Sequence, residues 1–277
     1  MHRFMLLAIA LIGLTPAAHA QTGSAASSTT MPGSGATVWE QRGERAATFG
    51  PQWIAFGLVH QGWITKWQKA RNKLVSHIDR CHLDVRSANR DTLLPVTLQC
   101  YRGQLVIERD ALQNERTVLQ QWPGLTEAVR TEALSAIDDM LDAIAPVMDA
   151  IDAKVFPTLD AFRDVRENLR SQYRQPYWLA TAHVRADAAL TWLDHLLLSL
   201  HALAQNQTLS VAAQETLSAT IACYEAAEPL ITAARDAETP EESRRNFSAA
   251  LAAITPCPLL LDEAHALQSR SSATSSH

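Results

Sequence analysis

Glycine is missing from more than half of this 277-residue chain. All ten glycines lie at or before Gly124, so residues 125–277 contain none. The strand-type alternation of apolar and polar residues is missing there too, whereas alanine and leucine are abundant. Because these residues favour helices, the two absences exclude a sheet-based body and predict an all-α fold.

Sequence signatures of catalysis and nucleotide binding are also lacking. The chain contains no H-E-x-x-H, C-x-x-C, C-x-x-C-H or G-x-S-x-G motif and no glycine-rich phosphate-binding loop. Residues 262–265 spell D-E-A-H, a helicase tetrapeptide, which carries no such function without that loop. We therefore expect a non-catalytic protein without a cofactor, and an enzyme of unrecognised type is the minority hypothesis.

Neither a block of like charge nor a second long apolar run is present. The chain has 24 basic and 29 acidic residues, which gives a formal net charge of −5. This mild acidity argues against nucleic acid or an anionic membrane as a partner. No stretch of 18 apolar residues follows residue 20, so we expect a protein that does not span a membrane.

The first 20 residues have the three parts of a secretory signal peptide. His2 and Arg3 form a basic start, residues 4–14 are apolar, and residues 18–20 make a small-x-small cleavage site. The apolar run is shorter than the roughly 20 residues that a membrane span needs. We expect cleavage after Ala20 and export to the periplasm. Cleavage removes Arg3 and no acidic residue, which takes the formal net charge from −5 to −6.

Two low-complexity segments flank the expected domain. Residues 21–37 are small, polar and aperiodic, and residues 269–277 are rich in serine. Both compositions are typical of disorder. We therefore expect a disordered linker and a disordered tail on either side of one helical-bundle domain over residues 38–268.

Apolar residues at steps of three and four predict an antiparallel bundle of five or six helices. Prolines inside this pattern predict kinks or breaks at Pro146 and Pro157 in the third helix and at Pro229 in the fifth. Thr239, Pro240 and Glu242 have the spacing of a capping box. The expected helices begin near Pro51, Pro95, Leu134, Pro176, Ser210 and Thr239.

The chain has four cysteines, an even number that favours disulfides in an exported protein. One pair lies almost symmetrically about the turn at residues 89–91, and the other about residues 239–240. Positions equidistant from the turn of an antiparallel hairpin face each other. The predicted disulfides, favoured over the crossed pairings, are Cys81–Cys100 and Cys223–Cys257.

A zinc site is the alternative for the first cysteine pair. His77 and Cys81 are one helical turn apart, which is good ligand spacing, and His82 and Cys100 could complete the set. The disulfide is favoured because exported proteins meet an oxidising environment. His82 also points away from the face that His77 and Cys81 share. We therefore predict no metal site.

Five large side chains share one face of the first expected helix, at steps of 3, 4, 3 and 4. They are Trp53, Phe56, His60, Trp63 and Trp67. One hypothesis is a groove for an apolar small ligand or a partner helix. The favoured hypothesis is a core seam, because the same face continues to Leu74 and Cys81. We expect Trp67 to lie in the core and Trp53 and Phe56 to form the accessible, binding-competent end.

Two polar stripes on later helices are the remaining candidates, either as a general base or as metal ligands. Both stripes lie opposite an apolar seam, so a solvated face is the favoured interpretation of each. On this interpretation, neither His183 nor Asp187 has a function. The stripes are His183, Asp187, Asp194 and His201 in one case, and Asp138, Asp142, Asp149 and Asp152 in the other.

Together these features predict an exported, non-catalytic binding or accessory protein of the cell envelope. Its helical surfaces would hold an apolar small molecule or an envelope protein, and not nucleic acid. A periplasmic inhibitor or immunity-type protein is the alternative. An enzyme or metal-binding protein that uses helix-borne histidine and aspartate is the least favoured class.

Overall fold

The computed structural model describes residues 53–205 and 209–274, and the side chains of residues 61–205 and 209–268. All regular secondary structure in these described residues is helical, which confirms the all-α class. The predicted signal peptide, linker and helix start at Pro51 lie outside them. The helices are α3 (Trp53–Ser87), α4 (Leu93–Gln121), α5 (Glu127–Asp152), α6 (Leu159–Leu169), the π-helical η2 (Arg170–Arg174), α7 (Gln175–Ala204), α8 (Val211–Glu225), α9 (Glu228–Arg235), α10 (Pro240–Ile254) and α11 (Cys257–Thr274).

The α3–α4 hairpin is closed by a hydrogen-bonded turn and a disulfide. The side-chain oxygen Oδ1 of Asn89 accepts hydrogen bonds from the backbone N–H groups of Asp91 and Thr92, both at 3.0 Å. The turn brings Cys81 to Cys100, whose Cα atoms are 5.5 Å apart in a disulfide. The predicted pairing of the first two cysteines is confirmed.

The third predicted helix is divided at its second proline, as expected. Pro146 lies inside α5, whereas Pro157 lies in the break between α5 and α6. Lys154 in this break has a φ of 55°, which a non-glycine residue adopts at a cost and which turns the chain out of α5. Thr158 then caps α6 by accepting a hydrogen bond from the backbone N–H of Ala161 at 3.2 Å. The chain therefore folds back so that α6, η2 and α7 follow α5 in the opposite direction.

The C-terminal part is built from two nested helix pairs. Thr239 starts α10 with the predicted cap, accepting from the backbone N–H of Glu242 at 3.2 Å, and α10 packs on α9. The helices that flank this pair in the sequence, α8 and α11, also pack on each other. A disulfide joins Cys223 of α8 to Cys257 of α11, with a Cα–Cα distance of 5.6 Å. The second predicted disulfide is confirmed.

The helix α11 was not expected from the sequence. Pro256 and Pro258 were predicted to close the last helix, but they separate α10 from a further helix that runs to Thr274. Pro258 lies in the first turn of α11, where backbone N–H groups have no intrahelical acceptor, so its missing N–H costs no hydrogen bond. Within the described residues, one stretch (Pro240–Gln268) is long and apolar enough to cross a membrane. It spans this break and is partly buried, so it is weak evidence for a span.

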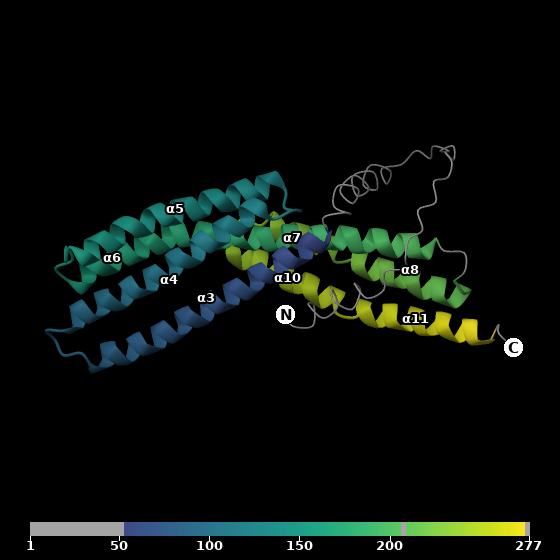
Figure 1. The fold of residues 1–277 in the computed structure, drawn as a ribbon, viewed down its shortest axis with the longest axis horizontal. Helices are drawn as coiled ribbons and strands as arrows, with labels where there is room; N and C mark the ends of the chain where they lie inside the picture. The colour runs from purple at the N-terminus through teal and green to yellow at the C-terminus, as the bar shows by residue number, and fades with distance from the viewer. Residues whose placement is uncertain (1–52, 206–208, 275–277) are drawn as a thin grey trace.

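Two hydrophobic cores, rather than one, hold these helices together. The first contains buried residues of α3, α4, α5 and α6, and the second contains residues of α8 to α11. α7 contributes Val184 to the first core and Leu193 and Leu197 to the second, so it connects the two. Figure 1 shows the result as an elongated molecule with α7 along its long axis. The prediction of a single antiparallel bundle is therefore not confirmed.

Candidate functional site

Of the aromatic stripe of α3, the structure describes the side chains of Trp63 and Trp67. Trp53, Phe56 and His60 lie on the described backbone of α3, but their side chains are outside the described set, so their role stays a prediction. Trp63 is 5% exposed and packs against Trp122 with ring centroids 5.3 Å apart. This part of the stripe belongs to the first core.

Trp63 also contacts a buried carboxyl group. Its Nε1–H donates a hydrogen bond to Oε1 of Glu115 at 3.3 Å, and the Tyr177 hydroxyl donates to Oε2 at 2.5 Å. Burial raises the pKa of the Glu115 carboxyl above its ordinary value, although the two hydrogen bonds and the nearby Arg185 charge act in the opposite direction. Glu115 was not identified from the sequence, because a lone glutamate in a helix resembles a surface residue.

Arg185 covers the next ring along the stripe. Its guanidinium carbon lies 5.0 Å from the Trp67 ring centroid and 5.8 Å from that of Trp63. Arg71 lies 5.6 Å from the Trp67 ring as well, and the Trp67 side chain is half-buried. Trp67 is therefore held between cations at the edge of the core, and it does not lie as deep as Trp63.

Glu115 is one of four residues that recur every seven positions along α4. The Glu108 carboxylate accepts two hydrogen bonds from Arg174, at 2.9 and 2.6 Å, and Arg174 lies over the ring of Tyr101. The Glu108–Arg174 contact joins α4 to η2, and the Glu115–Tyr177 hydrogen bond joins α4 to α7. We interpret this series of residues, which recur every seven positions, as a structural element that fixes the register of the helices. Its members are Tyr101, Glu108 and Glu115 of α4 and Trp122, the C-cap residue of that helix.

The expectation of a solvated polar face on α7 is wrong for its first members. Asp187 is 2% exposed, and its Oδ2 accepts a hydrogen bond from the backbone N–H of Thr126, the N-cap residue of α5, at 2.7 Å. Asp194 is also buried. The His183 ring lies between the Glu132 carboxylate and the Ala237 carbonyl oxygen, with its nitrogens 2.9 Å from each. These side chains connect α7 to its neighbours because that helix is surrounded on most sides.

The aspartates of α5 do face solvent, as expected. Asp142, Asp149 and Asp152 are exposed, and Asp138 is half-exposed. Two of the four are neutralised from α4, because Arg116 binds Asp138 and Arg102 binds Asp152. Within the described residues, no group of three histidine, cysteine, aspartate or glutamate side chains is arranged to hold a metal ion.

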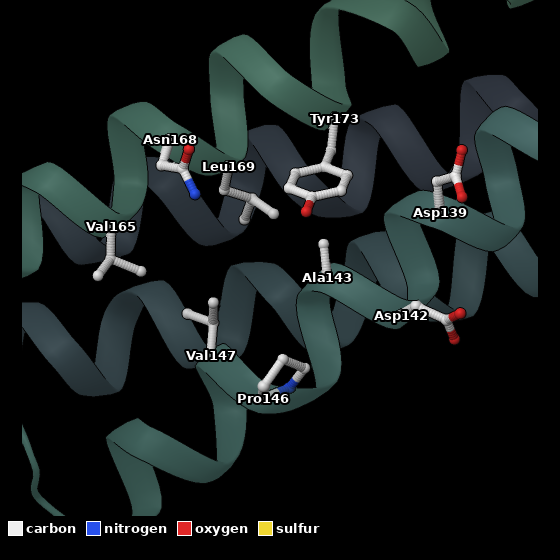
Figure 2. Close-up of a pocket in the computed structure, with 9 residues that line it drawn as sticks. All are labelled: Asp139, Asp142, Ala143, Pro146, Val147, Val165, Asn168, Leu169 and Tyr173. Atoms are coloured by element: carbon white, nitrogen blue, oxygen red, sulfur yellow. The ribbon is translucent and has the colours of Figure 1, made fainter.

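A groove follows α5 where it faces α6, η2 and the start of α7. It consists of two adjoining hollows of about 400 and 260 Å³, both lined by Asp139 and Tyr173. Figure 2 shows the larger hollow, where Val165 and Leu169 of α6 and Tyr173 of η2 face α5. The residues that complete the larger hollow are Asp142, Ala143, Pro146, Val147 and Asn168, and those that complete the smaller one are Glu132, Ser135, Ala136, Gln172, Pro176, Leu179 and Ala180.

Local sequence features explain why this groove is open. Ala136 and Ala143 are small residues seven positions apart on α5, so that side of the helix lacks bulk. Opposite them the chain passes through η2, whose wider π-helical turn replaces a regular α-helical turn before Pro176. Such π-helical insertions are frequent at functional sites. Sequence reasoning missed the groove because neither the π-helical turn nor the return of α6 along α5 has a residue signature.

The charge of the groove is unbalanced. Among the acidic residues of α5, Glu132 is bound by His183, and Asp138 and Asp152 are bound by arginines. Asp139 and Asp142, which line the larger hollow, are exposed and form no ion pair within the described residues. The groove therefore combines an apolar floor with a free negative rim on its α5 side.

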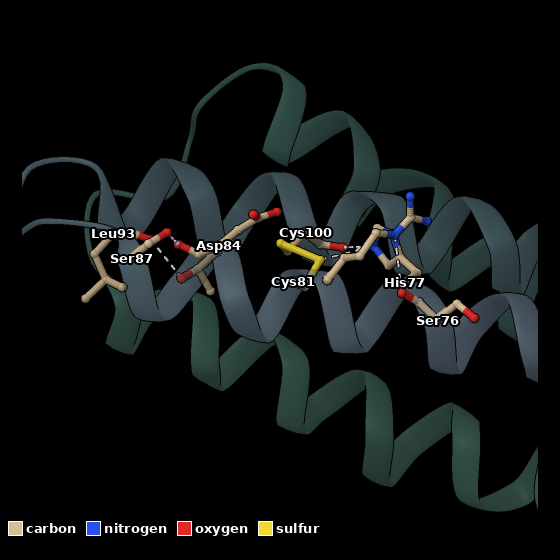
Figure 3. Close-up of a disulfide and its surroundings, with 9 residues drawn as sticks. Ser76, His77, Cys81, Asp84, Ser87, Leu93 and Cys100 are labelled. Carbon is tan, nitrogen blue, oxygen red and sulfur yellow. Dashed lines mark hydrogen bonds between the residues drawn. A yellow bond between two sulfur atoms is a disulfide. The ribbon is translucent and has the colours of Figure 1, made fainter.

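The zinc hypothesis for the α3–α4 hairpin does not hold, because both cysteines are used in the disulfide. His77 lies beside this disulfide, and its Nε2 donates a hydrogen bond to the Cys100 carbonyl oxygen at 2.8 Å (Figure 3). The ring fits against Gly103, where any Cβ atom would overlap it. His82 is exposed and takes no part. This cluster therefore serves the packing of α3 on α4.

Comparison with family models, with curated proteins and with solved structures finds no match for this chain.

Proposed function

We propose that this chain is an exported, non-catalytic binding protein of the periplasm, and that its groove along α5 holds a helical segment of a protein partner. The observation that carries the proposal is the free carboxylate pair, Asp139 and Asp142, beside an apolar floor that includes Val147, Leu169 and Tyr173. An apolar floor with a charged rim is the usual composition of a protein-binding surface.

Export is supported by the two disulfides. Both connect helices of the described body, and disulfides persist in oxidising compartments. The basic, apolar and small-residue order of residues 1–20 supports removal of a signal peptide in the same compartment. Together these features favour a periplasmic protein.

A protein segment suits the groove better than a small molecule. Pockets for small molecules enclose most of the ligand surface, whereas this groove has two adjoining open hollows. Its α5 side runs from Glu132 to Val147, which is about 22 Å at 1.5 Å per residue. A partner helix of about four turns would therefore cover it.

The groove is a better candidate than the aromatic stripe of α3. Trp63 is committed to the core and to Glu115, and Trp67 is covered by Arg185. Neither ring presents a free face of the kind that an apolar ligand needs. Trp53 and Phe56 stay as the predicted accessible end of the stripe.

Site-specific photocrosslinking in cells tests the proposal. A photoreactive amino acid in place of Asn168, an exposed residue of the groove, should give a discrete crosslinked partner. The same substitution at Glu215, an exposed residue of α8, is the control and should not. The identified partner is then purified and titrated against the protein and two charge-reversed variants.

Matched variants decide whether the groove is the binding surface. Asp139→Lys with Asp142→Lys should weaken binding by about tenfold or more, because the rim charge is reversed. Glu215→Lys with Glu263→Lys changes the net charge equally at exposed positions outside the groove and should leave binding unchanged. Equal affinity in the two double variants, or no crosslink specific to residue 168, would contradict the proposal.

A further inference from the structure

We propose that α3 of a second copy of this chain occupies the groove. The docking face is one flank of α3, formed by Lys66, Lys69, Lys73 and Arg80 and here named the basic stripe. The inference rests on the proposed groove and names its occupant.

The basic stripe becomes a feature only once α3 is folded. Its members are separated by 3, 4 and 7 residues, which places them on one side of a helix over about 21 Å. In the sequence they are interspersed with other residue types, so they do not form a block. All four side chains are exposed, and within the described residues none forms an ion pair. The flank ends at the exposed Asp84.

The position of α3 leaves the basic stripe accessible. α3 packs chiefly on α4, through the side that carries Trp63 and Cys81, and α4 in turn packs on α5. Figure 1 shows α3 and α5 on opposite sides of this part of the molecule, with α4 between them. The basic stripe therefore cannot reach the groove of its own chain. It can reach the groove of another copy.

The charges of the two surfaces recur with nearly the same pitch. Along α5, the exposed Asp139, Asp142 and Asp149 follow one another at steps of 3 and 7. The last three members of the basic stripe follow at steps of 4 and 7. Two helices laid side by side would therefore place each cation near a carboxylate. Within the described part of the chain, none of these charged groups forms an ion pair, and Arg80 donates a hydrogen bond only to the Ser76 carbonyl oxygen of its own helix.

An apolar contact extends the basic stripe. Leu83 follows Arg80 by three residues, so it lies beside it on the same flank, and it is 65% exposed. A large exposed leucine next to a charged flank is a suitable group to enter the apolar floor formed by Val147, Leu169 and Tyr173. Charge would orient the contact and this residue would add buried apolar area.

The two surfaces differ and lie on opposite sides of α4, so two copies cannot exchange both contacts at once and the contact is heterologous. Each copy offers one groove and one basic stripe, and a head-to-tail contact of this kind forms open chains or closed rings rather than a simple two-fold dimer. Because it depends on exposed charges, assembly should be strong at low ionic strength and weak at high ionic strength.

Analytical ultracentrifugation of the purified protein tests this assignment. At about 0.05 M salt the weight-average mass should rise with concentration above that of the monomer, and at about 0.5 M salt it should return to the monomer value. Asp139→Lys with Asp142→Lys and, separately, Lys69→Glu with Lys73→Glu should each abolish the rise. An equimolar mixture of the two double variants should restore it, because the intact basic stripe of one variant then meets the intact groove of the other, and the two reversed surfaces are again opposite in charge. Circular dichroism melting curves of both variants should match the wild type.

Each alternative outcome overturns the assignment in a recognisable way. A wild type that stays monomeric at low salt, or a mixture that stays monomeric, excludes the second copy. If the protein is monomeric but binds vesicles of anionic phospholipid, and Lys69→Glu with Lys73→Glu removes that binding, the basic stripe belongs to a lipid surface. If the protein is monomeric but the residue-168 crosslink depends on Asp139 and Asp142, the groove proposal stands and only its occupant changes.

Discussion

At the scale of single residues, the most unusual group is the buried carboxyl of Glu115. It accepts hydrogen bonds from Trp63 Nε1–H and from the Tyr177 hydroxyl, and the positive charge of Arg185 lies close enough to favour its ionised form. These contacts compensate for burial only in part, because burial is the largest influence and raises the pKa of the carboxyl. Burial also raises the pKa of the Tyr177 hydroxyl, which therefore stays a hydrogen-bond donor.

The raised pKa of Glu115 predicts a specific dependence of stability on pH. A folded-state pKa above the unfolded value means that this group contributes stability below its ordinary pKa of 4.5 and that the contribution is lost as the pH rises through the folded value. Urea denaturation from pH 4 upward should therefore show wild-type stability falling relative to Glu115→Gln as the pH increases. An exposed control, Glu263→Gln, should track the wild type at every pH. A constant difference between wild type and Glu115→Gln would contradict the raised pKa.

Asp187 gives a second prediction at this scale. Its carboxylate accepts the backbone N–H of Thr126, a group at the start of α5 that has no intrahelical partner. Asp187→Ala should lower the free energy of unfolding by about 1–3 kcal/mol, because a part-buried donor at the helix start loses its charged acceptor. Asp149→Ala, at an exposed position on α5, should change it by no more than about 0.5 kcal/mol. Similar melting temperatures for the two variants would show that the cap is unimportant.

At the scale of elements, α3 changes character along its length. Around Trp63 it is a core helix, with its ring against Trp122 and its N–H on Glu115. Around Trp67 it is at the edge of the core, between Arg71 and Arg185. From Lys66 to Arg80 its outer flank is the basic stripe.

This gradient predicts unequal costs of truncation. Trp63→Ala removes a buried indole and should cost about 3–5 kcal/mol in the free energy of unfolding. Trp67→Ala removes a half-buried ring held by cations and should cost clearly less. Chemical denaturation of the two variants measures the difference. An equal loss of stability in the two variants, or a larger loss for Trp67→Ala, would contradict the conclusion that Trp63 lies deeper in the core than Trp67.

The elements were predictable where the signal is local. Pro157 lies in the break between α5 and α6, Thr239 caps α10, and the symmetry of Cys81 and Cys100 about the turn identifies their pairing. The groove and the burial of Asp187 were not predictable, because each depends on contacts between different helices rather than on a local sequence signal. Asp187 meets Thr126 across 61 residues, and the same stripe of polar residues would suit a solvated helix. For Glu115, the recurrence of polar and aromatic residues every seven positions along α4 was the available signal.

At the scale of the whole molecule, two cores share one helix. α3 to α6 enclose the first half of α7, and α8 to α11 enclose its second half. Each half also has its own disulfide, in both cases at a helix that packs mainly on a single neighbour: α3 on α4, and α11 on α8. These two outer helices are the ones that depend most on a covalent link.

Removal of each disulfide should therefore loosen its own half and leave the other half protected. The loops of 19 and 34 residues predict about 3 and 4 kcal/mol for Cys81–Cys100 and Cys223–Cys257 in the chain-entropy model. Hydrogen–deuterium exchange of Cys81→Ala with Cys100→Ala should show faster exchange in α3, because few contacts besides those to α4 retain it. The matching Cys223→Ala with Cys257→Ala variant should show it in α11. Faster exchange spread over both halves in either variant would mean that α7 couples the two cores into one cooperative unit.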